Sequence, residues 1–190
     1  MQELIIYLMR GLPSCGKSYT ARKLAGHDGV ICETDEYFYT QVGSDPTRFD
    51  YKADLMPAAR QWNFDRFTAA VDAGRSPIIV DRGNSRCVES QRYARYALER
   101  GYRVELAEPD SPWWSEIRVL LKHKPHTLPA LEQWAQRLAT MSRSTHRVPA
   151  SMIIDWMRKW RVDLTVQDIL DYNPRPAQAS AATAQASAHH

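Results

Sequence analysis

An eight-residue segment, GLPSCGKS, follows directly on an apolar run at residues 3–10 and leads into a pattern typical of a helix. The segment fits GxxxxGK[ST] between a strand and a helix, which is the setting of a phosphate-binding loop. Gly11 and Gly16 let the backbone turn tightly, so that successive N–H groups point inward at an anion. We expect Lys17 to reach the β- and γ-phosphates of a nucleotide, and the Ser18 hydroxyl to bind Mg²⁺.

The predicted cofactor site takes in the whole loop and the start of the helix, whose dipole adds positive charge near the phosphates. Cys15 allows two interpretations: a thiol with a lowered pKa near a helix N-terminus, or a small residue that fills space. The residues of this segment predicted to bind nucleotide are Gly11, Leu12, Pro13, Ser14, Cys15, Gly16, Lys17, Ser18 and Tyr19.

Composition excludes several classes of protein but does not identify the function. A chain of 190 residues is long enough for one domain with a sizeable core, and a net charge of +3 is too small for a polycation that coats nucleic acid. Three cysteines without CxxC spacing indicate neither a disulfide framework nor a zinc site. Because neither a signal peptide nor a membrane-length apolar stretch is apparent, we expect a cytoplasmic protein without a membrane partner.

Strand and helix patterns alternate in the first part of the chain. This alternation predicts an α/β fold, with a parallel sheet flanked by helices and a ligand site at the carboxyl ends of the strands. The strand-like runs are residues 4–9, 30–32, 77–81 and 103–107, and the helical patterns are residues 17–25, about 55–73 and about 88–100.

After Pro109 the pattern becomes helical without further strands. We expect one domain over residues 1–172, with a C-terminal helical lid at about 111–160, and a disordered Ala/Ser-rich tail at 173–190. The lid helices are predicted at 113–121, 128–141 and 149–160, with Trp134, Leu138, Met141, Trp156, Met157 and Trp160 facing a core, and a further helical turn at 165–170.

Two aspartates follow strand ends. Asp35 lies just beyond the second strand, where it could act as the general base of phosphoryl transfer or merely cap a turn. Asp81 ends the third strand, the position of a carboxylate that holds Mg²⁺, although it could instead satisfy turn N–H groups. Glu33 and Glu36 are weaker candidates, and we expect Glu36 to face solvent.

Basic residues gather between and after the lid helices. Arg143, His146 and Arg147 could supply positive charge over a γ-phosphate, or could form an ordinary solvated face. The basic segments 122–126 and 158–161, with Trp113, Trp114 and Trp160 nearby, could contact a nucleic acid backbone and stack bases.

Taken in order, the blocks GLPSCGKS, TDEYFY, IIVDRGNS, EPDSPWW and THRVP resemble the polynucleotide-kinase-like P-loop kinases, an AAA-type, zeta-toxin-like group. The resemblance is to the branch of the Nedd-four-binding-protein kinase-like domain. It implies a P-loop NTPase-type fold, ATP and Mg²⁺ as cofactors, and Asp35 as the base on the acceptor hydroxyl. It further implies that Asp81 belongs to the magnesium or acceptor network and that Arg143 lies in the lid.

The sequence departs from this family at several points. The loop after the third strand reads DRGN where DNTN is usual, and the lid reads HRVP where HGVP is usual. Tyr37, Phe38 and Tyr39 stand where phage-type enzymes carry an arginine, and such rings could stack a base or sugar.

These features predict transfer of a γ-phosphoryl group from a nucleotide triphosphate to a hydroxyl, most simply the 5′-hydroxyl of DNA or RNA. One alternative is a small-molecule kinase that acts on a nucleoside, sugar or antibiotic hydroxyl, because folds of this type are shared between such enzymes. The other is a nucleotide-binding interaction module with little transfer activity.

Overall fold

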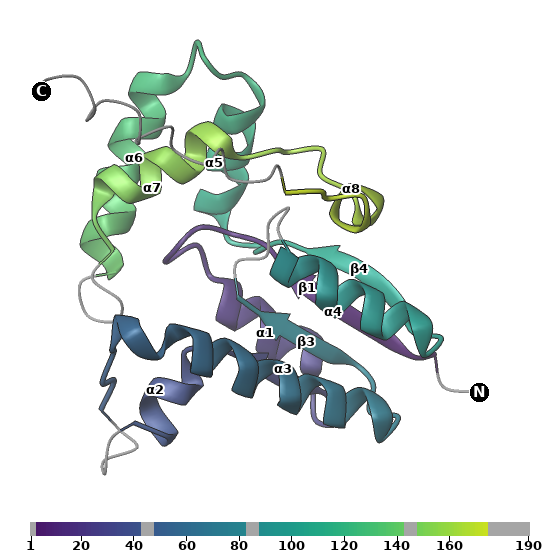
Figure 1. The fold of residues 1–190 in the computed structure, drawn as a ribbon. Coiled ribbons are helices and arrows are strands. Elements are labelled where there is room, and N and C mark those ends of the chain that lie inside the picture. The colour runs from purple at the N-terminus through teal and green to yellow at the C-terminus, as the bar shows by residue number, and fades with distance from the viewer. Residues whose placement is uncertain (1–2, 43–47, 83–87, 143–147, 175–190) are drawn as a thin grey trace, which may run out of the picture.

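A four-stranded parallel sheet forms the centre of the computed structural model, which describes residues 3–42, 48–82, 88–142 and 148–174 (Figure 1). The strand order is β2-β3-β1-β4, and Glu33 of β2 lies opposite Asp81 of β3. The predicted α/β class with a parallel sheet is therefore confirmed. The strands are β1 (Ile5–Met9), β2 (Val30–Glu33), β3 (Ile78–Asp81) and β4 (Arg103–Ala107).

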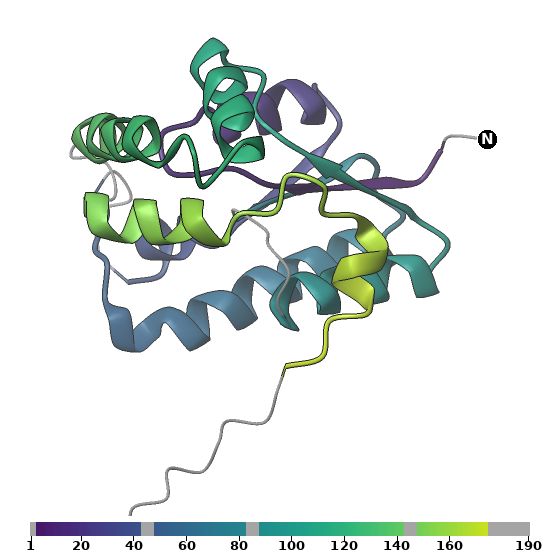
Figure 2. The same ribbon diagram turned by 90° about the horizontal axis from the view of Figure 1, so that it is seen from above.

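Helices cover both faces of the sheet. Because side chains alternate along a strand, Ile6 and Leu8 face one layer, and Tyr7 and Met9 face the other. Figure 2 shows the sheet edge-on between the two layers. Helix α1 (Lys17–Ala25) lies on one side, and α3 (Met56–Asp72), α4 (Val88–Glu99) and α8 (Val166–Leu170) lie on the other.

The remaining long helices form a layer of their own, above the sheet in Figure 1. They are α5 (Pro112–Lys122), α6 (Leu128–Met141) and α7 (Ala150–Lys159). Their shared apolar core includes Trp114, Leu131 and Met157, together with Leu12 and Cys15 of the glycine-rich loop. The loop is therefore packed directly against the helical layer.

Two side chains that were expected to face this core, one of Trp and one of Met, do not face it. Trp156 is 39% exposed and Met141 is 47% exposed. On α7 the buried stripe runs through Ile153 and Met157, four residues apart, so the neighbouring Trp156 points away. The same geometry applies on α6, where the buried stripe at Leu131, Ala135 and Leu138 leaves Met141 outside.

The sequence patterns did not predict the short helix α2 (Glu36–Thr40) or the 3₁₀ turn at Ala53–Leu55. The longest described helix, α3, has 17 residues, whereas a bilayer span needs about 20 apolar ones. None of the described helices is long and apolar enough to cross a membrane.

Candidate active site

The glycine-rich loop connects β1 to α1 and has the conformation that its glycines allow. Gly16 has a φ of 91°, a left-handed value that disfavours residues with a Cβ. A Cβ on Gly11 would lie 2.8 Å from Cγ of Lys17 and 3.0 Å from Cγ of Pro109, so a larger residue would displace the Lys17 side chain. The Lys17 ammonium donates a 3.0 Å hydrogen bond to the Leu12 carbonyl, which holds its charge at the loop.

Other loop residues serve mainly to pack. Leu12 and Cys15 are buried, and burial raises the pKa of the Cys15 thiol to about 12. This favours the space-filling interpretation of Cys15, since a protonated, enclosed thiol is not reactive. Pro13 and Ser14 are half-buried, and Tyr19 is 66% exposed at the start of α1.

Asp81 lies at the end of β3 beside the loop. It is 4% exposed, it is hydrogen-bonded to Ser18, and its Oδ2 has no hydrogen-bond partner among the described residues. Burial raises the pKa of Asp81, and the nearby Lys17 partly offsets this. A buried, unpartnered carboxylate oxygen next to a hydroxyl is the hard oxygen donor set that Mg²⁺ prefers. The described residues contain no cluster of three or more His, Cys, Asp or Glu side chains that could hold a metal ion.

Glu33 and Asp35 bring two further carboxylates to the same edge. Glu33 lies opposite Asp81 across the β2–β3 pairing. Burial, with the charges of Asp81 and Asp35, raises the pKa of Glu33 to about 7. Asp35 occupies the N-cap position of α2 but makes no side-chain capping hydrogen bond within the described chain. The charges of Asp35 and Lys17 both act on Glu33 and on Asp81. Three carboxylates and Lys17 therefore lie together at one edge of the sheet.

An aromatic group follows Asp35. Neighbouring ring centroids in this group are 5.1 to 6.1 Å apart, and Tyr51 is 54% exposed. Glu36, on α2, is half-exposed and pairs with Arg66, whose guanidinium lies over Trp62. The members of the aromatic group are Tyr37, Phe38, Tyr39, Phe49, Tyr51 and Trp62.

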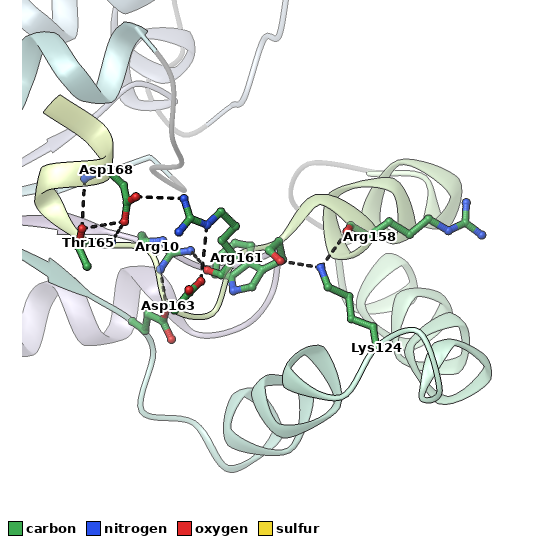
Figure 3. A network of polar contacts seen from close by, with 9 residues as sticks. Arg10, Lys124, Arg158, Arg161, Asp163, Thr165 and Asp168 are labelled. Atoms are coloured by element: carbon green, nitrogen blue, oxygen red, sulfur yellow. Dashed lines mark hydrogen bonds and ion pairs between the residues drawn. The ribbon is translucent and has the colours of Figure 1, made fainter. Parts of the chain in front are cut away.

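Two members of the basic segments, Lys124 and Arg161, contact other parts of the protein (Figure 3). The Lys124 ammonium donates to the carbonyl oxygens of Met157, Arg158 and Trp160, at 3.0, 2.8 and 2.6 Å, where α7 ends. Trp114 is 1% exposed and Trp160 is 9% exposed. The prediction that these two tryptophans stack bases is therefore wrong.

Arg10, which the sequence patterns did not single out, forms a buried cluster directly before the loop. Its Nη1 pairs with Glu108 Oε1 at 3.1 Å, and its Nη2 donates to the Arg161 carbonyl at 2.6 Å. The guanidinium carbon lies 4.5 Å from the centroid of the Trp160 ring. The sequence feature that could have pointed to Arg10 is its place as a charged residue directly after an apolar strand.

Several predicted residues lie outside the described part of the chain. They are Arg143, His146 and Arg147, together with most of the predicted tail.

Comparisons with known proteins concern the family and the fold of this chain. A family model described as the AAA domain matches residues 6–127. Human NEDD4-binding protein 2 is 38% identical over 125 residues, which are 65% of this chain and 7% of that protein. Human YLP motif-containing protein 1 is 29% identical over 127 residues, which are 56% of this chain and 6% of that protein. The chain thus spans less than a tenth of the length of these curated relatives.

A solved structure shares the fold. In the structure of the Pnkp1/Rnl/Hen1 RNA repair complex, one chain aligns with 98% of this chain over 53% of its own length, with a TM-score of 0.51 and 15% identity. The family match itself covers more than half of the chain and includes the loop, Asp35 and Asp81. This chain therefore belongs to the AAA domain family and carries a P-loop kinase-like domain.

Proposed function

We propose that this chain is an ATP- and Mg²⁺-dependent phosphotransferase that moves a γ-phosphoryl group to the 5′-hydroxyl of DNA or RNA. One observation carries the proposal. Asp81, Glu33 and Asp35 gather with Lys17 at the edge of the sheet where the loop begins α1. A protein that only binds nucleotide needs the loop and Lys17, but it has no use for an additional carboxylate near the transferred group.

The loop and Lys17 would bind the phosphates. Lys17 contacts the Leu12 carbonyl through a single hydrogen bond, so its ammonium can turn toward a bound anion at little cost. Phosphoryl transfer depends almost entirely on positioning and charge stabilisation, and a lysine beside inward-facing N–H groups provides both.

Ser18 and Asp81 would hold the metal ion. Their oxygens fit Mg²⁺, because Oδ2 of Asp81 is buried and lacks a hydrogen-bond partner among the described residues. When bound there, Mg²⁺ would supply positive charge that offsets the negative charge of the nucleotide phosphates.

Asp35 would act as the general base. It accepts the proton of the acceptor hydroxyl while that oxygen bonds to the γ-phosphorus and the bond from phosphorus to the β–γ bridging oxygen breaks. Arg143 and Arg147, which lie outside the described residues, are proposed to supply positive charge over the γ-phosphate. The helical layer α5–α7 would then act as the lid that excludes water.

The acceptor assignment rests on one feature of the described residues. The aromatic group beside Asp35 offers rings on which a terminal base or sugar can stack, and Tyr51 is open to solvent. The fold is also shared with a chain of an RNA repair complex, although at 15% identity this likeness concerns the fold alone.

The test is transfer of label from γ-labelled ATP with Mg²⁺ to 5′-hydroxyl DNA and RNA oligonucleotides, with free nucleosides and sugars as competing acceptors. Lys17→Ala is the inactive variant, and Arg95→Ala, at an exposed arginine of α4 outside the basic segments, is the control. Labelled oligonucleotide that disappears only in Lys17→Ala supports the proposal. Label on small acceptors alone would indicate a small-molecule kinase, and ATP binding without transfer would indicate an interaction module.

A further inference from the structure

The segment EPDSPWW, residues 108–114, joins β4 to α5 and has no part in the proposed reaction. Four of its polar side chains nevertheless contact the phosphate loop or its flanks. Glu108 pairs with Arg10, directly before the loop, and accepts a 3.2 Å hydrogen bond from the Trp114 indole. Asp110 accepts from Thr20 at 3.0 Å and from Lys23 at 2.7 Å, and both of these lie on α1.

Two contacts reach the loop backbone itself. The Trp113 indole N–H donates to the Ser14 carbonyl at 3.1 Å, and the Ser111 hydroxyl donates to the Cys15 carbonyl at 2.9 Å. These are consecutive carbonyls inside the phosphate loop. Trp113 is half-buried, so its indole ring is held by packing in the helical layer while its N–H reaches the loop.

Because the peptide bond is planar, a contact that fixes a carbonyl also fixes the direction of the next N–H. In a trans peptide the carbonyl and the N–H of the following residue lie in one plane and point in opposite directions. Holding the Ser14 and Cys15 carbonyls toward α5 therefore turns the N–H groups of Cys15 and Gly16 away from α5. The Cys15 N–H accordingly meets the Leu12 carbonyl at 3.4 Å, the same oxygen that Lys17 contacts.

The loop needs such support because its conformation is costly. Ser14 has a φ of 59°, a left-handed value for a residue with a Cβ. Residues in this region persist only where the surrounding structure holds them. The hydrogen bonds from Ser111 and Trp113 act on the two peptide units that follow this position.

We infer that Ser111 and Trp113 are positioning residues, which hold the Ser14 and Cys15 carbonyls toward α5 and so keep the loop in a conformation in which the Gly16 N–H faces a bound polyphosphate. The inference rests on the proposed function, because it presumes that the loop binds nucleotide. Ser111 also caps α5 by accepting a hydrogen bond from the Trp114 N–H at 3.2 Å. One hydroxyl thus connects the placement of the helical layer with the shape of the loop.

The first test is Trp113→Phe, which removes the indole donor and keeps an aromatic ring. Its matched control is Trp134→Phe, because the Trp134 indole donates a 3.0 Å hydrogen bond to Glu116, between α6 and α5. Loss of one hydrogen bond at the loop should weaken ATP binding about 2- to 10-fold. Calorimetry on the full chain with Mg²⁺ should show this loss for ATP and ADP, with adenosine binding unchanged, and no loss in Trp134→Phe.

The second test compares Ser111→Ala with Ser111→Thr. The alanine variant loses the hydroxyl that contacts Cys15, and the threonine variant retains one, so ATP affinity should fall in the first and recover in the second. This pair decides the question if Trp113→Phe fails to fold.

Three results are distinguishable. ATP affinity that is equal in Trp113→Phe and Trp134→Phe, or in Ser111→Ala and Ser111→Thr, overturns the inference and leaves the proposed function standing. An equal loss for ATP and adenosine also overturns it, because a phosphate-loop effect must depend on phosphates. A wild-type chain that binds no ATP removes the proposed function, and the inference with it.

Discussion

Replacing Glu33 by Gln should change how the stability of this protein depends on pH. Glu33 ends β2 opposite Asp81, and burial, with the charges of Asp81 and Asp35, raises its pKa from an ordinary 4.5 to about 7. The folded state therefore holds this proton more tightly than the unfolded chain does. The resulting stability is fully present below pH 4.5 and is lost as the pH rises to 7.

The size of the effect follows from the two pKa values. A carboxyl that titrates near 4.5 in the unfolded chain and near 7 in the folded protein lowers the unfolding free energy by up to about 3 kcal/mol at pH 8. Glu33→Gln removes this titration. The variant should therefore gain stability over the wild type as the pH rises, with a gain that approaches about 3 kcal/mol at pH 8.

Urea unfolding of both proteins between pH 4.5 and pH 8, without Mg²⁺ or nucleotide, measures this difference. Asp81 also has a raised pKa and contributes to the pH dependence of both proteins, so the informative quantity is the difference between them. Glu99→Gln is the matched control, because that side chain is 70% exposed on the last turn of α4. A difference between wild type and Glu33→Gln that stays constant across this range would refute the reasoning.

Two further substitutions test contacts of the helical layer, one that joins the layer to the sheet and one within the layer. Arg10→Met removes the buried partner of Glu108, which keeps its 3.0 Å pair with Arg118, so the unfolding free energy should fall by about 1 to 3 kcal/mol, and Arg10→Met/Glu108→Gln should recover part of the loss in the same urea titration; a double variant no more stable than Arg10→Met would contradict this. Lys124→Met leaves three carbonyl oxygens at the end of α7 without their donor, so thermal unfolding followed by circular dichroism should show a loss of about 1 to 3 kcal/mol; an unchanged midpoint would show that water replaces the ammonium.

Much of this fold could be predicted from local sequence signals. The residues of α1, α6 and β4 match the predicted ranges, because each range shows a clear period and is bounded by proline, glycine or the loop motif. Asp35 and Asp81 could be assigned to one edge because parallel strands bring their carboxyl ends together.

Other features depend on contacts that sequence patterns do not encode. The opposition of Glu33 and Asp81 requires the register of β2 on β3, and the bonds of Trp113 and Ser111 to the loop cross almost a hundred residues of sequence. Trp156 was assigned to the wrong side of α7 because apolar residues occur on two faces of that helix, and only packing decides which face is buried.

The central claim is that Asp35 serves the transfer of a phosphoryl group at this loop. The most direct measurement compares Asp35→Asn with wild type in both ATP affinity and the rate of γ-phosphoryl transfer to a 5′-hydroxyl oligonucleotide. Asp54→Asn, at an exposed carboxylate of the 3₁₀ turn, is the control. The account predicts unchanged ATP affinity with a transfer rate lowered about 10²- to 10⁴-fold in Asp35→Asn alone. Transfer at the wild-type rate in Asp35→Asn would contradict it.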